Sequence, residues 1–254
     1  MQRSLNVTGV VFSKRQQCGD FKWMVKQPQY QNAIFVIMEN FLDMMEDVPK
    51  AGGGTACLRI FTLKAVGDES KVRACGIPTG WSTETQGFPE LTTYYSKFAI
   101  DLAMERLIIL IRNNPHIDTV IYSCDDTNQD LVGTNIFKDT LSPNVVEYIS
   151  KLLHNLPSRI NRPTKWTYDK IEHYELGKLY PHALLQHMYE GAQLTIKRLT
   201  QKSKSFSSGT GKIASHSNDF IWKTIVKTQN TTVKTPIARN NIAPITRKSP
   251  WLKN

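Results

Sequence analysis

The chain has 254 residues, 40% of them hydrophobic, so it is long enough and apolar enough to bury a real core. Its longest apolar run, residues 107–111, is far too short to cross a membrane, and no signal peptide is recognisable at its start. The four cysteines form no C-x-x-C pair and have no histidine at zinc-site spacing, which argues against a zinc centre. We therefore expect a soluble intracellular protein with buried free thiols, no membrane partner, no metal and no cofactor.

The charge is distributed very unevenly along the chain. Residues 1–195 carry 20 basic and 21 acidic side chains, whereas residues 196–254 carry 12 basic side chains and a single acidic one, Asp219. From about Gln201 onward, small polar residues, Lys and Pro predominate, and such a segment cannot bury enough apolar surface to offset its ordering entropy. The sequence predicts a disordered basic tail over residues 201–254. This tail either is solvated without a dedicated partner or contacts the phosphates of nucleic acid.

The first part of the chain alternates short apolar runs with polar turns. Residues 33–38 are continuously apolar and rich in branched and aromatic side chains, which favours a strand buried on both faces, as in a parallel sheet. Glu39 and Asn40 place polar groups at its carboxyl end. The expected elements are, in chain order, a strand over residues 5–12, a second over 21–25, the buried strand over 33–38, a connecting segment with one helical turn over 41–49 and a short helix over 55–61.

The rest of the chain alternates strands with longer helices. Residues 72–81 indicate a strand that runs into a loop, and residues 118–123 indicate another buried strand. The longest helix is expected to open at Pro89 and to stop before Pro115, because its apolar side chains recur at helical spacing. The remaining expected helices cover residues 143–156 and 182–199.

This order of elements defines the predicted fold. Strands that alternate with helices favour right-handed crossovers and a mostly parallel sheet. We therefore expect an α/β fold with a mixed, mostly parallel sheet flanked by helices over residues 1–157. A helical extension packed on this domain is expected over residues 158–200, followed by the disordered basic tail over residues 201–254.

Two glycine-rich segments each follow a predicted strand. The first contains Gly52, Gly53 and Gly54, and the second begins Gly133-Thr134. Glycine lets the backbone take positive φ and approach a ligand closely, and a helix that starts there offers free N–H groups to an anion. Such loops at the carboxyl ends of two strands suit the diphosphate between two nucleosides. The alternatives are a flexible turn and a simple helix start, and the absence of a following Gly-Lys-Ser/Thr argues against a kinase-type P-loop.

The motifs also occur in a recognisable order. They are I-F-V-I-M-E-N at residues 34–40, G-G-G-T-A-C-L-R at 52–59, G-I-P-T at 76–79 and G-T-N-I-F at 133–137. Over residues 30–156 this order resembles an uncharacterised family of bacterial, phage and large-virus proteins with the motifs F-V-F-G-D-N, G-G, G-I-P-T and G-T-G, which is distantly similar to macrodomains. The chain departs from that family where Met38 and Glu39 replace Gly-Asp and where Asn135 replaces the second glycine of G-T-G; Asn best tolerates the left-handed conformation.

The resemblance implies ADP-ribose or a related nucleotide as the ligand. The two glycine loops would clamp its diphosphate, and Asn40 would reach the distal ribose. The ligand-binding residues indicated by the motifs are Glu39, Asn40, Gly52, Gly53, Gly54, Arg59, Asp125, Gly133, Thr134 and Asn135.

Several of these residues have an equally simple structural interpretation. Asn40 at a strand end can cap a turn through its side chain, and Arg59 is either a solvated helix residue or a phosphate partner. Asp125 and Asp126 either hold a metal or a water, or form a solvated turn. Trp81 either stacks on a base or belongs to the core.

Three functional hypotheses follow from these residues. The first is a module that binds ADP-ribose or a related nucleotide, or hydrolyses it slowly with Glu39 or Asp125 as the base. The second is a nucleic-acid-binding or virion-packaging accessory protein that acts through residues 201–254. The third is a metal-dependent nuclease with Glu39, Asp125 and Asp126 as ligands. None of the four motifs contains a histidine, so a Ser-His-Asp or Cys-His site is poorly supported.

Overall fold

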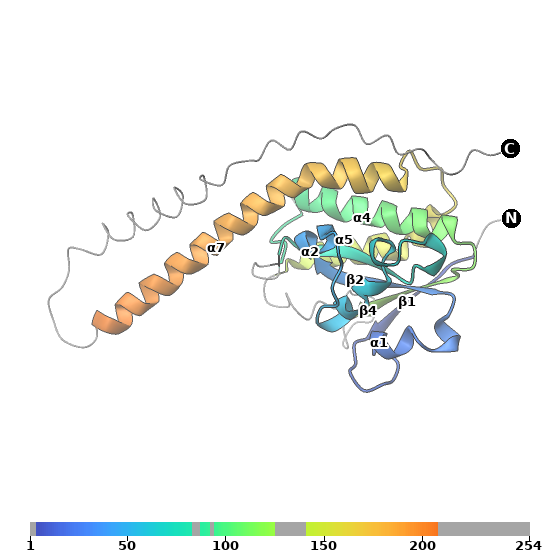
Figure 1. Cartoon of the computed structure of the whole chain (residues 1–254), viewed down its shortest axis with the longest axis horizontal. Helices are drawn as coiled ribbons and strands as arrows, with labels where there is room; N and C mark the ends of the chain where they lie inside the picture. Colours follow the sequence, from blue (N-terminus) through green and yellow to red (C-terminus); the bar gives the residue numbers. More distant parts are fainter. Residues whose placement is uncertain (1–3, 83–86, 92–93, 125–140, 208–254) are drawn as a thin grey trace. The chain divides into compact units, whose positions relative to one another are not determined.

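The computed structural model describes residues 4–82, 87–91, 94–124 and 141–207, and these contain a parallel sheet with helices on both faces (Figure 1). The chain divides into two compact units, Met1–Arg198 and Leu199–Asn254. The elements are, in chain order, β1 (Asn6–Val11), α1 (Phe21–Met24), η1 (Pro28–Tyr30), β2 (Ala33–Asn40), α2 (Phe41–Met45), η2 (Gly54–Phe61), α3 (Leu63–Val66), η3 (Glu69–Lys71), β3 (Ala74–Gly80), α4 (Tyr94–Asn113), β4 (Thr119–Cys124), α5 (Pro143–His154), α6 (Leu156–Arg159), the π-helical η4 (Lys170–Glu175) and α7 (Leu176–Ser207).

The described strands form one sheet in the order β1-β4-β2-β3, and every pairing is parallel. Val120 of β4 lies between Val7 of β1 and Ile34 of β2, and Val36 of β2 pairs with Cys75 of β3. The predicted α/β fold is confirmed, and the sheet formed by these strands is parallel throughout.

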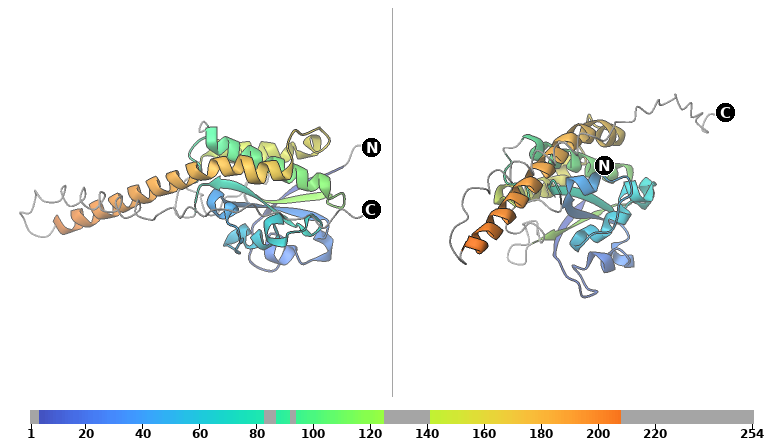
Figure 2. Two further views of the ribbon diagram at one scale, coloured as in Figure 1. Left: turned by 45° about the horizontal axis from the view of Figure 1, so that its top comes forward. Right: turned by 60° about the vertical axis from the view of Figure 1, so that its left-hand side comes forward.

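Helices cover both faces of this sheet, which explains why all eight residues of β2 are buried. Phe35 and Ile37 pack with Phe21 of α1 and Leu58 of η2. Side chains at the alternate positions of β2 pack in a second cluster that includes residues of α4 and α5. Figure 2 shows α4 and α5 on one side of the sheet and α1 and η2 on the other. The buried run at residues 33–38 therefore belongs to a central strand, as predicted.

The predicted strand over residues 21–25 is wrong, because this segment forms the short helix α1. Asp20 is the N-cap of α1, and its Oδ1 accepts a hydrogen bond of 3.1 Å from the Trp23 N–H. Phe21 and Met24 lie three residues apart and are both fully buried against the sheet. The polar residues before Phe21, which the sequence predicts to form a turn between two strands, instead start a helix.

In the second half of the chain, α7 is longer than predicted, whereas α4 and α5 are slightly shorter. Helix α4 stops before Pro115 as expected, but α7 is the longest described helix, with 32 residues against 20 for α4. It begins at Leu176, and Pro181 lies inside it. It also continues to Ser207, so residues 201–207 are helical rather than disordered, and the rest of the predicted tail lies outside the described residues. None of the described helices is both long and apolar enough to span a membrane.

Candidate functional site

The carboxyl ends of β2 and β3 meet at one edge of the sheet. β2 is followed by α2 and η2, and Leu58 of η2 packs on the same face of the sheet as α1. β3 is followed by α4, which packs on the opposite face. Neighbouring parallel strands whose connections diverge in this way open a crevice at their carboxyl ends, where α/β folds bind ligands. The register also shifts between Glu39 and Asn40, as in a β-bulge, at this end of β2. The topology therefore marks this edge as the candidate site.

The three-glycine turn (Gly52, Gly53 and Gly54) lies beside this edge. Thr55, the residue after it, accepts a hydrogen bond of 3.3 Å through Oγ1 from the backbone N–H of Met38 in β2. Gly54 has φ +57, and a Cβ atom at Gly53 or Gly54 would meet no other atom within 4 Å. The turn also starts η2, whose first N–H groups have no partner within the helix. The Gly52 N–H already donates to the Ala56 carbonyl at 3.0 Å, so the backbone donors that the turn offers next to open space are those from Gly53 onward.

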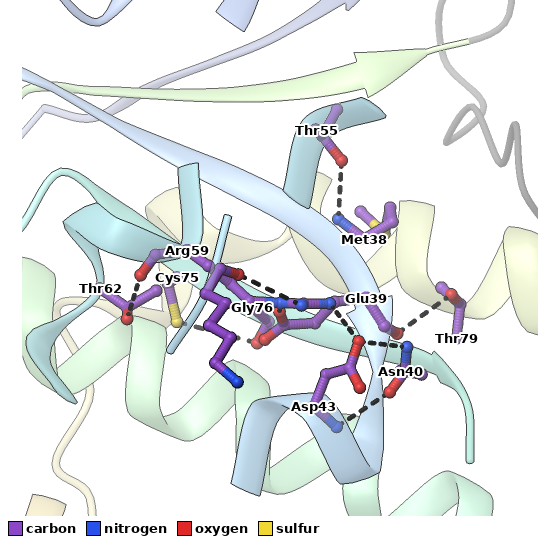
Figure 3. Close-up of polar contacts among 11 residues, drawn as sticks. Met38, Glu39, Asn40, Asp43, Thr55, Arg59, Thr62, Cys75, Gly76 and Thr79 are labelled. Atoms are coloured by element: carbon purple, nitrogen blue, oxygen red, sulfur yellow. Dashed lines mark hydrogen bonds and ion pairs between the residues drawn. The ribbon is translucent and has the colours of Figure 1, made fainter. Parts of the chain in front are cut away.

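The acidic end of β2 is held by an arginine from η2 (Figure 3). Arg59 Nε donates to Glu39 Oε2 at 2.6 Å, and Arg59 Nη2 donates to Asp43 Oδ2 at 2.7 Å. Asn40 is the N-cap of α2: its Oδ1 accepts from the Asp43 N–H, and its Nδ2 donates to Asp43 Oδ2, both at 2.9 Å. One guanidinium therefore joins β2, α2 and η2 through two carboxylates.

Gly76 of β3 makes room for this network. A Cβ atom at position 76 would lie 1.9 Å from Glu39 Oε1 and 2.6 Å from its carboxyl carbon, so only glycine fits beside the buried carboxylate (Figure 3). The first residue of the G-I-P-T motif therefore has a packing role. It belongs to the same arrangement as Glu39 and Arg59, although the sequence analysis did not place it in the site.

Burial changes the ionisation of the two partners in this pair. Loss of water raises the pKa of Glu39, and the charge and hydrogen bond of Arg59 oppose that rise without cancelling it. Burial alone would lower the pKa of Arg59, but Glu39 and Asp43 together raise it, so the guanidinium stays charged. Glu39 therefore binds a proton more tightly in the folded protein than in the unfolded chain.

This shift predicts a pH-dependent contribution of Glu39 to stability. The contribution is fully present below the unfolded pKa of about 4.3 and is lost as the pH rises through the raised folded pKa. Glu39→Gln cannot titrate, so the unfolding free energy of wild type minus that of the variant is expected to fall as the pH rises from about 4 through the raised pKa of Glu39. Urea denaturation at several pH values measures this difference. A difference that grows with pH would show instead that pairing with Arg59 outweighs burial.

A second buried ion pair lies close to the pair formed by Glu39 and Arg59. Arg106 of α4 is 5% exposed, its Nε lies 3.0 Å from Glu172 Oε2 in η4, and its Nη2 donates to the Tyr168 hydroxyl at 3.3 Å. Burial raises the pKa of the neighbouring Cys75 thiol to about 11, so this thiol stays protonated. Arg106 and Cys75 line a cavity of about 10 Å³ that also touches Glu39, room for about one water molecule. This interior is too small to hold a nucleotide.

The structure brings together six of the predicted site residues. Glu39, Asn40 and Arg59 lie in one network, and the three-glycine turn leads from it into η2. Arg59 is buried, so it is not a solvated helix residue, and Asn40 has the capping role that was the alternative to ligand contact. Whether these side chains also contact a ligand stays a prediction.

The other predicted site residues are not placed. Asp125, Gly133, Thr134 and Asn135 lie outside the described residues, as does Asp126. The second half of the proposed diphosphate clamp and the nuclease hypothesis therefore stay predictions. Within the described ranges, no group of three or more His, Cys, Asp or Glu residues is arranged to hold a metal ion.

Two expectations about individual side chains change. Trp81 is 5% exposed and packs edge-on against Phe41 and Phe88, so it belongs to the core rather than to a base-stacking surface. All four cysteines are free as predicted, but Cys18 is exposed and Cys57 is only partly buried. Asp43 of α2 also belongs to this site, although nothing in the sequence around it indicates its contact with Arg59.

Comparison with known proteins adds no assignment to this geometry. No protein-family model, curated protein or solved structure matches the chain.

Proposed function

We propose that the protein binds ADP-ribose or a related nucleotide at the carboxyl edge of its sheet. The observation that carries this proposal is the open three-glycine turn beside the end of β2. The turn has positive φ at Gly54, starts a helix and lies where neighbouring connections diverge. A diphosphate is a suitable ligand because backbone N–H groups bind its oxygens without requiring a charged side chain.

Hydrolysis of the ligand is the less supported part of this hypothesis. Glu39 is buried and paired with Arg59 through Oε2, so it is poorly placed to accept a proton from a water at the surface. Asp125, the other candidate base, follows β4 outside the described residues. We therefore propose binding as the main activity.

Gly53→Val tests the turn with little risk to the fold. Gly53 has φ −78 and ψ 165, an extended conformation that valine favours, and its Cβ would meet nothing within 4 Å. The added side chain would occupy the space from which a diphosphate approaches. We expect ADP-ribose binding, measured by titration calorimetry, to weaken about tenfold or more, which is the loss of about 1.4 kcal/mol.

Gly191→Val is the matched control, because Gly191 of α7 is also surrounded by open space. It should leave the affinity unchanged, and both variants should keep the wild-type melting temperature within a few degrees, because valine is not a poorer helix former than the glycine it replaces in α7. No heat with wild type at millimolar ligand would end the proposal. Equal affinity of wild type and Gly53→Val for ADP-ribose would show that the turn does not contact the ligand.

A second function is favoured by the charge of the carboxyl-terminal segment. The 12 basic side chains against one acidic one after residue 195 suit a nucleic-acid partner, as in an accessory or packaging protein. Because α7 continues to Ser207, the chain should be ended after that residue rather than at residue 200. We expect this shortened protein to lose most of its affinity for a DNA duplex and most of the salt dependence of binding. Undiminished binding would contradict a role for the tail.

A further inference from the structure

A cleft of about 490 Å³ lies at the opposite end of the body from the three-glycine turn. It is lined by the carboxyl-terminal half of α4, the end of α5, α6 and the segment that follows. Helices that connect parallel strands run antiparallel to them, so the ends of α4 and α5 lie toward the amino edge of the sheet. The cleft is therefore separate from the candidate nucleotide site.

The lining of this cleft is basic. Its charged residues are Arg112, Arg159, Arg162, Lys165 and a single carboxylate, Glu105. That carboxylate is already used, because Glu105 pairs with Arg159 at 2.5 Å and accepts a hydrogen bond of 3.1 Å from Thr164 Oγ1. Among the described residues, Arg112, Arg162 and Lys165 form no ion pair with a carboxylate. The cleft therefore keeps an excess of positive charge.

Arg112 also holds the wall of the cleft in place. Its Nε and Nη2 donate to the carbonyl oxygens of Ile160 and Arg159, both at 2.9 Å, and Nη2 also reaches the carbonyl of Arg162. These carbonyls do not neutralise the guanidinium charge. The contact fixes the chain segment that carries the exposed cations Arg162 and Lys165.

An aromatic ring lies at the same place. Trp166 lines the cleft and is half-buried against the core, so its indole has a fixed position. The ammonium groups of Lys165 and Lys170 lie over this ring, 5.0 and 5.1 Å from its centre. Both lysines are exposed, so a base that stacks on the ring would displace one of these side chains toward the phosphates. Aromatic rings surrounded by flexible cations are what proteins use to bind single-stranded nucleic acid, in which bases stack on the ring and phosphates meet the cations.

We infer that this cleft binds single-stranded nucleic acid. Trp166 provides the surface on which a base stacks, and Arg162 and Lys165 contact the flanking phosphates. A chain of phosphates fits better than a free nucleotide, because the cations are spread along one exposed segment rather than gathered around one point. This inference concerns a site of the folded body and does not depend on the nucleotide proposal.

The test compares two full-length variants that lose the same charge. Arg162→Gln with Lys165→Gln removes two cations from the cleft, and Lys14→Gln with Arg15→Gln removes two exposed cations from the β1–α1 loop. Anisotropy of a labelled oligothymidylate of about 12 nucleotides measures binding. We expect the cleft variant to bind about tenfold more weakly at about 0.1 M salt, with the salt slope reduced by about 1.4, and the loop variant to change less than about twofold.

Trp166→Leu tests the stacking separately. Leucine keeps an apolar contact with the core but has no aromatic face, so we expect about tenfold weaker binding with an unchanged salt slope. Thermal melting of each variant shows whether the fold is kept, and Gly53→Val should bind the oligonucleotide like wild type. Equal losses in the cleft and loop variants, or no binding by wild type, would overturn the inference. Displacement of the oligonucleotide by thymidine monophosphate at equal phosphate concentration would instead assign the cleft to a small phosphate ligand.

Discussion

Gly76→Ala is expected to destabilise the folded protein by about 3–5 kcal/mol, the cost of breaking a buried ion pair by displacing one partner. The new methyl group would lie 1.9 Å from Glu39 Oε1, so the carboxylate has to leave its position 2.6 Å from Arg59 Nε. The side chain of Glu39 cannot move aside easily, because Gly76 of β3 and Glu39 of β2 lie on paired neighbouring strands whose residues are all buried. Urea denaturation followed by circular dichroism measures the loss.

Two controls separate this clash from a general effect of replacing glycine. Gly177→Ala in α7 adds a methyl group where nothing lies within 4 Å, and it is expected to be neutral or to stabilise by up to about 1 kcal/mol. In a Glu39→Ala background, Gly76→Ala should cost much less, because the atoms that it would strike are absent. A full-size loss in that background would mean that the clash with Glu39 is not the cause.

Arg59→Met is the second substitution with a large expected effect. It leaves the side chains of Glu39, 2% exposed, and Asp43, 22% exposed, without their cation, and we expect a loss of about 3–5 kcal/mol. Most of this loss comes from the buried Glu39, because Asp43 is still partly exposed to water and still accepts a hydrogen bond from Asn40. Chemical denaturation at neutral pH measures it, and acid pH should reduce it because Glu39 then becomes neutral.

Replacing both partners distinguishes the cost of an unpaired charge from the value of the pair. The double variant Arg59→Met with Glu39→Met leaves no buried charge behind and is expected to recover most of the loss. Lys71→Met breaks the surface pair with Asp68, whose side chains are 72% and 42% exposed, and should leave the unfolding free energy unchanged within error. If the double variant is as unstable as Arg59→Met, the pair is needed for more than charge balance.

The strands of the sheet could be predicted from the sequence because burial on two faces leaves a local pattern. Residues 33–38 are apolar at every position and rich in branched and aromatic side chains, a pattern typical of a strand covered on both sides. The short helix α1 could not be predicted in this way, because a helix of four residues and a strand of four residues can contain the same apolar side chains, so the pattern does not distinguish them. There the deciding contact is the cap by Asp20, a single hydrogen bond.

The site itself could be predicted only in part. The three-glycine turn is visible in the sequence because its backbone freedom belongs to the residue type. The pairing of Glu39 with Arg59 is not visible, because it joins residues twenty positions apart that only the folded chain brings together. The same reason hides the basic cleft, which combines α4, α5 and α6 with Trp166.

The order of the strands also has a consequence for how the protein is made. Among the described strands, β1 has β4 as its only neighbour, and β4 also fills the place between β1 and β2. A ribosome releases β1 first and β4 last, so the nascent chain exposes an unpaired amino-terminal strand until Cys124 has emerged. Synthesis that stalls before Thr119 would therefore yield an aggregation-prone fragment, and this stretch is where a co-translational chaperone would be needed most.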